Sequence, residues 1–320
     1  MIYTLTPNPA LDISGTADKI VPNEKTYVYN ETRHPGGNAI NAARIIATLG
    51  VPVTATGFLG GSIGYEIRQL LDAEGIRERF VKVNGQTRIN LTVFENQSHS
   101  QTRFSFPGPA ITVREFRALF SLMSQLQDGD LLVVGGSLPP GLSVKHLAKI
   151  VWLCKRHRIP CFVDSPAGVL KHIIREGPVF IKPNLLEFQE LIDKKPRTID
   201  SVVKEAQALT PQVPLICVSS VEGGAVLVTP SGAWFAKGPQ VKARTSVGAG
   251  DSMVGGMAAH FWRRKLHTGT DTDAQLAREA PLMLRWGLAA ALASITAENT
   301  VLGKAREIKA FFKKIKVEAV

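Results

Sequence analysis

The sequence predicts an α/β protein in which helices cover both faces of a central, mostly parallel sheet, with a small separate β-sheet beside it. In the central and C-terminal parts of the chain, short apolar runs that end in polar residues alternate with helix-like stretches of about 10–15 residues. Two other stretches show the alternating pattern of β-hairpins instead. The 320 residues, 44% of them hydrophobic, suit one large domain spanning 1–320.

The alternation of strands and helices predicts where functional residues gather. The expected strands are 131–137, 159–165, 179–184 and 214–220, and the expected helices are Val144–His157, Gly168–Arg175, Leu185–Asp193 and Ser201–Leu209. In a parallel sheet, ligands bind in the crevice beyond the carboxyl ends of the strands. The polar residues that end these runs are therefore expected along one edge: Ser137, Asp164, Ser165, Lys182 to Asn184, Ser219 and Ser220.

The two stretches with alternating polarity, 13–33 and 87–106, leave the α/β pattern and rejoin it without an intervening helix. We expect them to pair into one small sheet that serves as a lid over the site or as an interface between subunits.

The charge balance favours anionic partners. Lysine and arginine outnumber the acidic residues 38 to 27, which gives a net charge of +11 and an isoelectric point near 9.7. The densest basic clusters, 263–265 and 313–316, are short and lack interleaved aromatic residues, so we expect solvated helix faces and no nucleic-acid partner.

The apolar segments predict neither a membrane span nor a secretory leader. No stretch reaches the roughly 18 consecutive apolar residues of a membrane helix. The first residues, MIYTLTPNPALD, are expected to form a strand. The three cysteines (Cys154, Cys161 and Cys217) lie in apolar runs without a CxxC pair, which is typical of buried thiols in a reducing cytoplasm.

The segment 245–251, TSVGAGD, runs directly into an apolar helix. Successive backbone N–H groups of Gly248, Ala249 and Gly250 can converge at a helix N-terminus, where an anion is favoured. Asp251, beside them, is suited to accept a hydroxyl proton during phosphoryl transfer. The alternative is a glycine-rich helix start with Asp251 as a favourable first-turn acid.

Two further motifs admit a functional and a structural interpretation. In PGGNAIN (35–41), Gly36 and Gly37 allow close backbone approach and Asn41 faces whatever binds there, although a plain loop and helix start would look the same. In KPNLLE (182–187), Asn184 and Glu187 provide oxygen ligands for Mg²⁺ and its waters. The same spacing also forms a capping box.

Single charged residues complete the candidate site. Asp12 ends the first strand region, where a carboxylate can accept hydrogen bonds from sugar hydroxyls. Lys25, Arg88 and Arg103 lie in the small β-sheet and can bind an anionic group, or be solvated surface charges. No GxxxxGK[ST] sequence is present, and no GxGxxG follows the first strand, which disfavours P-loop and dinucleotide-binding proteins.

Taken together, PGGNAIN, KPNLLE and SVGAGDSMVGG resemble, in order and spacing, the PfkB (ribokinase-like) family of carbohydrate kinases across essentially the whole chain. TLTPNPALD, GGSLPPG and RFSFPGP are similar to its phosphosugar branch, which comprises 6-phosphofructokinase, 1-phosphofructokinase and tagatose-6-phosphate kinase. The resemblance implies a three-layer sandwich with a β-lid, ATP as phosphoryl donor, Mg²⁺, K⁺ in some members, and a homodimer formed through the lid.

The resemblance also implies roles for individual residues. Asp251 is the base, and Gly248, Ala249 and Gly250 form the anion hole. Asp12, Gly36, Gly37 and Asn41 bind the sugar, and Lys25, Arg88, Asn90, Arg103 and Ser137 lie on the substrate side, with Arg103 resting on local pattern alone. Lys182, Asn184, Ser219 and Gly224 match nucleotide-contacting positions, Asn184 and Glu187 match the magnesium motif, and Thr245 and Val247 match potassium positions.

The sequence departs from the branch at Asn38-Ala39, where glycine pairs or Lys-Gly are usual, at Tyr27, and in the loosely similar region near 286–300. These departures concern the identity of the sugar phosphate. Val163–Ser165 and Arg88–Asn90 favour fructose 6-phosphate, with fructose 1-phosphate and tagatose 6-phosphate as alternatives. An inactive sugar-binding regulator on the same fold is the alternative from a different class.

Overall fold

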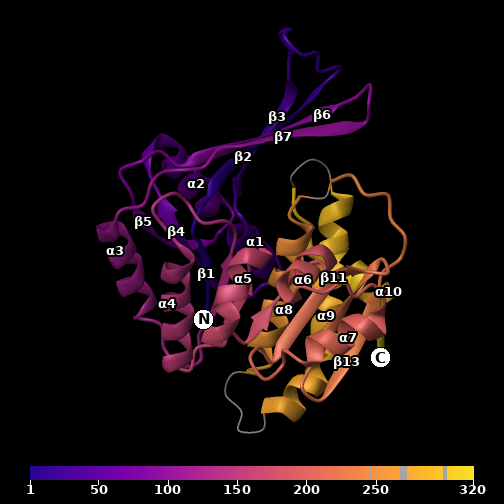
Figure 1. Cartoon of the computed structure of the whole chain (residues 1–320). Helices are drawn as coiled ribbons and strands as arrows, with labels where there is room; N and C mark the ends of the chain where they lie inside the picture. The colour runs from indigo at the N-terminus through magenta and orange to yellow at the C-terminus, as the bar shows by residue number, and fades with distance from the viewer. Residues whose placement is uncertain (246, 267–271, 298–300) are drawn as a thin grey trace.

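Two β-sheets organise the chain in the computed structural model, which describes residues 1–245, 247–266, 272–297 and 301–320. The larger sheet is the middle layer of a three-layer sandwich, and the smaller sheet projects from one end of it (Figure 1). The arrangement confirms the predicted α/β class with a mostly parallel sheet and a separate small sheet.

The larger sheet has ten strands among the described residues, in the order β14-β13-β12-β11-β10-β9-β8-β1-β4-β5. They are β1 (Ile2–Thr6), β4 (Val53–Leu59), β5 (Arg77–Lys82), β8 (Leu131–Gly135), β9 (Cys161–Asp164), β10 (Phe180–Ile181), β11 (Leu215–Val221), β12 (Gly224–Thr229), β13 (Gly232–Lys237) and β14 (Lys316–Ala319). The seven neighbouring strands β11, β10, β9, β8, β1, β4 and β5 pair in parallel. β12, β13 and β14 add an antiparallel edge beside β11.

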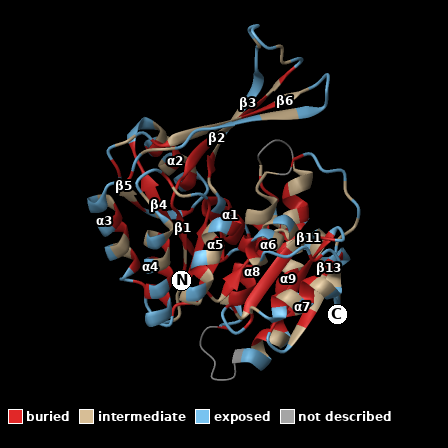
Figure 2. Ribbon diagram, in the orientation of Figure 1, coloured by how far each residue is buried: buried red, intermediate tan, exposed pale blue. Residues whose placement is uncertain are grey.

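Helices cover both faces of this sheet. One face carries α1 (Asn38–Thr48), α2 (Gly61–Ala73), α8 (Ala249–Arg263), α9 (Thr272–Thr296) and α10 (Ala305–Lys314). The other carries α3 (Val113–Met123), α4 (Val144–Arg156), α5 (Ala167–Ile173) with a short 3₁₀ turn (Ile174–Glu176), α6 (Leu185–Ile192) and α7 (Ile199–Gln207). Each helix turns an apolar stripe to the sheet, so the chain has two hydrophobic cores, one on each side (Figure 2).

Burial on both faces explains why the inner strands of the large sheet could be predicted from the sequence. β8 is an unbroken apolar run whose residues are all buried, the pattern of a parallel strand between two helical layers. The antiparallel edge was not predicted. β12 is buried throughout but begins at a glycine, and β14 is a short strand that follows a basic helix and is largely exposed.

The smaller sheet consists of β2 (Ala10–Ala17), β3 (Tyr29–Gly36), β6 (Arg88–Glu95) and β7 (Ser100–Ser105), in the order β3-β2-β6-β7. It joins the two segments 13–33 and 87–106 through parallel pairing of β2 with β6, which sets Asp12 opposite Asn90. Because side chains alternate between faces, Asp12, Arg88, Asn90 and Arg103 all share one face of this sheet. Toward their free ends, the strands become exposed (Figure 2).

Candidate active site

The N-terminus of α8 points its first amides at the edge of the large sheet. Gly248 precedes the helix with φ 74°, a left-handed conformation that glycine adopts without strain. The amides of the next residues, Ala249 and Gly250, are first-turn donors without an acceptor in the helix. Together with the helix dipole, they form a site for an anion, as the sequence predicts.

Asp251 lies in this first turn and is held by a residue from the other glycine-rich motif. Asn41, buried on α1, donates from Nδ2 to Asp251 Oδ2 at 2.9 Å, although the two are 210 positions apart in sequence. The hydrogen bond fixes the direction of the carboxylate. The two motifs singled out in the sequence therefore meet at one point.

The environment of Asp251 suits a general base. Burial, with a further contribution from the charge of Asp164, raises the pKa of Asp251 to about 7. The hydrogen bond from Asn41 and the charge of Lys182 oppose the shift. A base whose pKa is near neutral accepts a proton most effectively at physiological pH.

Lys182 brings a buried positive charge to the same place. It follows β10, and its Nζ lies 3.4 Å from Asp164 Oδ1, at the end of the neighbouring strand β9. A methyl group built on Gly250 would lie 3.2 Å from this Nζ, so the ammonium lies against the first turn of α8. Burial lowers the pKa of Lys182, but Asp164 and the other nearby negative groups outweigh burial and raise it, so the side chain stays charged.

A cavity of about 630 Å³ opens beside Lys182 and the start of α8. One wall is polar and comes from the strand ends, with Asn184, Ser219, Ser220 and Gly224. The other wall is apolar and comes from α8 and α9, with Met253, Leu288, Ala291, Leu292 and Ile295. A planar apolar group with an anionic tail directed at α8 fits this arrangement, and Lys182, Asn184, Ser219 and Gly224 all lie here as expected for nucleotide contacts.

On the other side of Asp251, the small sheet presents Asp12. Asn90 donates from Nδ2 to Asp12 Oδ1 at 2.8 Å, and burial raises the pKa of Asp12 against the opposing effects of Asn90 and nearby arginines. A methyl group on Gly36 would lie 2.2 Å from the Asp12 carboxyl carbon, so this position requires glycine. Gly37, with φ 114°, is the N-cap residue directly before α1.

Arg88 is anchored to the backbone at the base of the small sheet. Its two terminal nitrogens donate to the carbonyl oxygens of Asn8 and Phe106, each at 3.0 Å. The Asn8 side chain in turn donates to Pro107 O at 3.0 Å and to Ser137 Oγ at 3.4 Å. These residues join the loops after β1, β7 and β8 beside Asp12.

Arg103 and Lys25 differ in their placement. Arg103 shares the face of the small sheet with Asp12, and its charge lowers the pKa of that carboxyl. Lys25 is exposed between β2 and β3, with its Nζ 4.7 Å from the centre of the Tyr27 ring.

Comparison with known proteins identifies the family. Residues 9–304 match the model of the pfkB family of carbohydrate kinases. The chain belongs to this family. It is 34% identical to the ATP-dependent 6-phosphofructokinase isozyme 2 of Escherichia coli, with 94% of each chain covered, and 35% identical to the 1-phosphofructokinase of E. coli, with 80% of this chain and 82% of that protein covered. The structure of phosphofructokinase-2 from E. coli in complex with substrates and products superposes with a TM-score of 0.88 at 33% identity over 98% of both chains.

The pfkB assignment makes the protein a carbohydrate kinase with a ribokinase-like fold. The candidate ligands for a divalent metal are Asn184 and Glu187. Asn184 and Glu187 form a capping box at the start of α6, in which Asn184 Oδ1 accepts from Glu187 N at 2.9 Å and Glu187 Oε2 accepts from Asn184 N at 2.8 Å. The capping interpretation is therefore correct. It does not displace the metal one, because Glu187 is only partly buried and its charge acts on Lys182 beside the cavity.

The donor set at this edge suits Mg²⁺. No group of three or more potential protein ligands occurs within the part of the chain that the structure describes. Mg²⁺ keeps several waters and commonly takes one or two carboxylates besides substrate phosphates, so a full cluster of protein ligands is not required. Glu187 and Asn184, whose oxygens lie together at the start of α6, can provide such ligands.

The predicted potassium residues lie just before the first turn of α8. Val247 donates from its backbone to Thr245 Oγ1 at 3.1 Å, and Thr245 is buried. Ser246, between them, lies outside the described residues.

Sequence reasoning missed several residues of the site. Asn8 gave a weak signal, as a polar residue after the first strand run. Asp164 was expected at the sheet edge but without a role at the base. The apolar wall from α9 lies in the region near 286–300, where the resemblance was loose.

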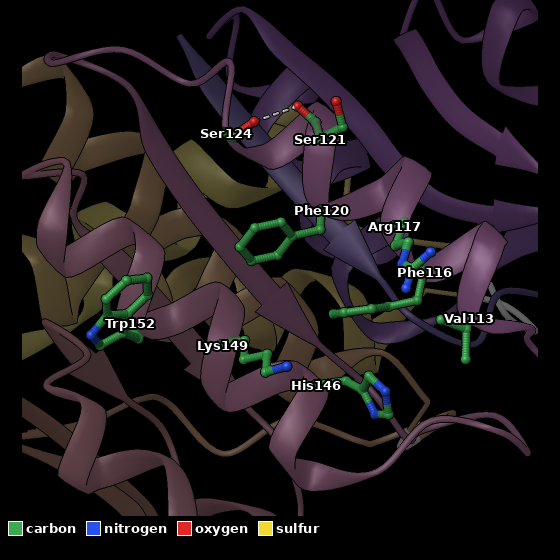
Figure 3. A pocket seen from close by; sticks show the side chains of 9 residues that line it. All are labelled: Val113, Phe116, Arg117, Phe120, Ser121, Ser124, His146, Lys149 and Trp152. Carbon is green, nitrogen blue, oxygen red and sulfur yellow. Dashed lines mark hydrogen bonds between the residues drawn. The ribbon is translucent and has the colours of Figure 1, made fainter.

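A cavity of about 690 Å³ lies elsewhere, between α3 and α4, and does not belong to this site. Figure 3 shows it lined by aromatic side chains such as Phe116, Phe120 and Trp152, with Lys149 and His146 from α4 beside them. It contains neither Asp251 nor the N-terminus of α8, so no part of the phosphoryl chemistry is assigned to it.

Proposed function

We propose that the protein transfers the γ-phosphoryl group of ATP to a hydroxyl of fructose 6-phosphate and forms fructose 1,6-bisphosphate. The observation that carries the proposal is the position of Asp251, between a cavity suited to a nucleotide and the polar face of the small sheet. The 6-phosphofructokinase isozyme 2 of E. coli, 34% identical over 94% of the chain, supports fructose 6-phosphate as the first choice. Relatives named 1-phosphofructokinase that cover 80% and 99% of the chain keep fructose 1-phosphate as the alternative.

The substrate hydroxyl lies between Asp12 and Asp251 in this proposal. Asp12 accepts hydrogen bonds from the sugar, and Asn90 orients Asp12 for that purpose. The phosphate that the sugar already carries binds the basic face of the small sheet at Arg88 and Arg103. Gly36 gives the sugar access because a side chain there would collide with the Asp12 carboxylate.

Proton transfer and bond exchange follow from the geometry around Asp251. Asp251 takes the hydroxyl proton as the hydroxyl oxygen forms a bond to the γ-phosphorus. The bond from that phosphorus to the bridging oxygen breaks, and its electron pair leaves with ADP. The amides of Ala249 and Gly250, with Lys182, stabilise the charge on the phosphoryl oxygens.

Metal ions complete the proposed site. Asn184 and Glu187 are placed to hold Mg²⁺ through its waters, and the ion supplies charge neutralisation on the phosphates. The phosphofructokinase-2 of E. coli has been crystallised in complex with potassium. Thr245 and Val247 are the residues that we propose for K⁺ in this chain.

The small sheet is proposed to act as a lid and as a dimer interface. Its polar face covers the substrate and excludes water, which would otherwise accept the phosphoryl group. Phe104 on β7, Tyr27 before β3 and Phe106 after β7 are 52%, 73% and 57% exposed, so a second copy of the chain has apolar surface to cover. Sedimentation velocity of the purified protein tests the homodimer.

A cytoplasmic location is proposed on the state of the cysteines. Cys154, Cys161 and Cys217 are free and buried, as expected in a reducing compartment. No helix among the described residues is long and apolar enough to cross a membrane.

An assay of ADP release with a panel of sugar phosphates tests the function. We expect turnover with fructose 6-phosphate and a lower kcat/KM with fructose 1-phosphate and tagatose 6-phosphate. Preference for another member of the panel changes the substrate but keeps the reaction. Binding of a sugar phosphate without turnover of any of them favours the inactive regulator and contradicts the proposal.

A further inference from the structure

The side chain of Asn38 lies where two elements of the site meet, α1 and the loop after β8. Asn38 is the first residue of α1 and follows Gly37 directly. It is exposed, and a methyl group built on Gly136 would lie 3.5 Å from Asn38 Oδ1. The loop after β8 that contains Gly136 continues to Ser137, which accepts from Asn8. Asn38 therefore begins the helix that carries Asn41 and lies against the loop that carries Ser137.

The spacing along α1 places Asn38 on the side of the base. Asn38 and Asn41 are three positions apart, so their side chains lie on one face of the helix, about 5–6 Å apart at Cβ. Asn41 donates to Asp251. Asn38 is thus one turn farther from the base and one turn nearer to the Ser137 loop.

The amide of Asn38 is available for a ligand. The parts of the chain that the structure describes provide no hydrogen-bond partner for its side chain, whereas Asn8, Asn41 and Asn90 nearby each donate to another residue of the site. A primary amide offers two donors and an acceptor without charge. A neutral hydroxyl is the group that matches it, because a phosphate would favour a cation or several donors.

From this geometry we infer that Asn38 is a further substrate-binding residue, whose amide hydrogen-bonds a hydroxyl of the sugar phosphate and helps to decide which sugar phosphate is accepted. The inference rests on the proposed function. The hydroxyls of ketohexose phosphates differ in position and configuration, so one fixed amide near the acceptor distinguishes them. A site that hydrogen-bonds a hydroxyl discriminates against analogues that cannot place one there.

The test compares Asn38→Ala and Asn38→Asp with the wild type on fructose 6-phosphate, fructose 1-phosphate and tagatose 6-phosphate. Alanine removes the amide and favours the helix, and we expect kcat/KM for the preferred sugar phosphate to fall about 3- to 10-fold, the size of one neutral hydrogen bond. Aspartate keeps the shape but removes the donors and adds a charge beside the phosphates, so we expect a fall of about 10- to 100-fold. The KM for ATP should change less than about twofold.

The ranking of substrates separates a specificity role from a structural one. We expect Asn38→Ala to change the ratio of kcat/KM between the best and second substrates by at least about threefold. Asn84→Ala, at an exposed asparagine in the loop before β6, is the matched control and should leave every constant unchanged. An equal change on all three sugars, or none, would overturn the inference.

Failure of the proposed function is distinguishable from failure of this inference. If the wild type turns over no member of the panel, calorimetric binding of fructose 6-phosphate to the wild type and Asn38→Ala still tests the amide. Binding weakened about 3- to 10-fold supports the role of Asn38 in sugar recognition. Equal affinity, or no binding to either protein, contradicts it.

Discussion

Replacement of Asp251 by asparagine tests the base directly, because asparagine keeps the size of the side chain and can still accept the hydrogen bond that Asn41 donates at 2.9 Å. Only the ability to take a proton is lost. We expect kcat to fall by about 10²–10⁴, the usual range for a general base. The KM for ATP should not rise, since the change removes a negative charge beside the phosphates.

The pH dependence carries a second expectation. A base works only when it is deprotonated, and Asp251 has a pKa of about 7. The rate of the wild type should therefore rise with pH through about 7 and level off above it. The residual rate of Asp251→Asn should not show this rise with pH, because asparagine does not titrate.

The same pKa predicts that the variant is the more stable protein at alkaline pH. The pKa of Asp251 is higher in the folded state, at about 7, than its ordinary value of 3.8, so folding favours the protonated carboxyl. This advantage is complete below pH 3.8 and is lost as pH rises through 7. Three pKa units correspond to about 4 kcal/mol at most. We expect Asp251→Asn to be about 1–4 kcal/mol more stable at pH 8 and equal to the wild type near pH 4.

Two measurements decide these points. A coupled assay of ADP release from about pH 5 to 9 measures how the rate depends on pH. Urea unfolding at pH 4 and pH 8 measures the difference in free energy of unfolding between the wild type and Asp251→Asn. Retention of more than about a tenth of kcat would falsify the assignment of the base. Equal free energies of unfolding for the wild type and Asp251→Asn at pH 8 would contradict the cost of ionising the Asp251 carboxyl in the folded protein.

Three further substitutions test the metal and the sugar side. Glu187→Gln can keep the capping box, so it should raise the Mg²⁺ concentration for half-maximal rate and cost less than about 1 kcal/mol in stability; a melting shift with unchanged metal dependence would leave capping as its only role. Arg88→Ala should raise the KM for the sugar phosphate about 10- to 150-fold and leave the KM for ATP constant. Arg88→Lys keeps the positive charge but loses the two hydrogen bonds that Arg88 donates to the backbone. A KM that Arg88→Lys recovers in part therefore shows that the charge binds the phosphate. Gly36→Ala pushes a methyl group into Asp12 and should raise the KM for the sugar by at least about tenfold; an unchanged KM would show that Asp12 does not contact it.

The sequence predicts the centre of the fold better than its edges, and the reason is burial. β8 and β11 are apolar because helices cover both faces, so their runs stand out from any flanking sequence. β14 pairs on one side only and has the charged, exposed sequence of an edge strand. Its place in the sheet depends on β13, 79 positions earlier by the pairing of Lys237 with Lys316, and no local pattern reveals such a partner.

Site residues could be predicted where their arrangement follows from the local backbone of one motif. They were missed where the arrangement depends on packing between segments far apart in the sequence. Gly248 and Asp251 belong to one helix start, so their roles follow from local geometry. The link from Asn41 to Asp251 joins residues 210 positions apart, and the resemblance placed both residues in the site without giving the contact. Lys25 lies in the exposed segment between β2 and β3, and its role in binding the substrate stays a prediction.

The division of the site between two sheets has a consequence for how it works. The large sheet and α8 hold Asp251, Lys182 and the nucleotide cavity on a core that is buried on both faces. Asp12, in contrast, lies on the small sheet, near the end that joins the body, whereas the strands of this sheet become exposed toward the tip. Arg33 on β3 forms a forked ion pair with Glu66 on α2, at 2.6 and 2.9 Å, and ties the small sheet to the body. Because proton transfer needs a donor and acceptor at hydrogen-bond distance, the proposed reaction depends on both sheets, with Asp251 held beside the large sheet and the sugar hydroxyl bound at the small one.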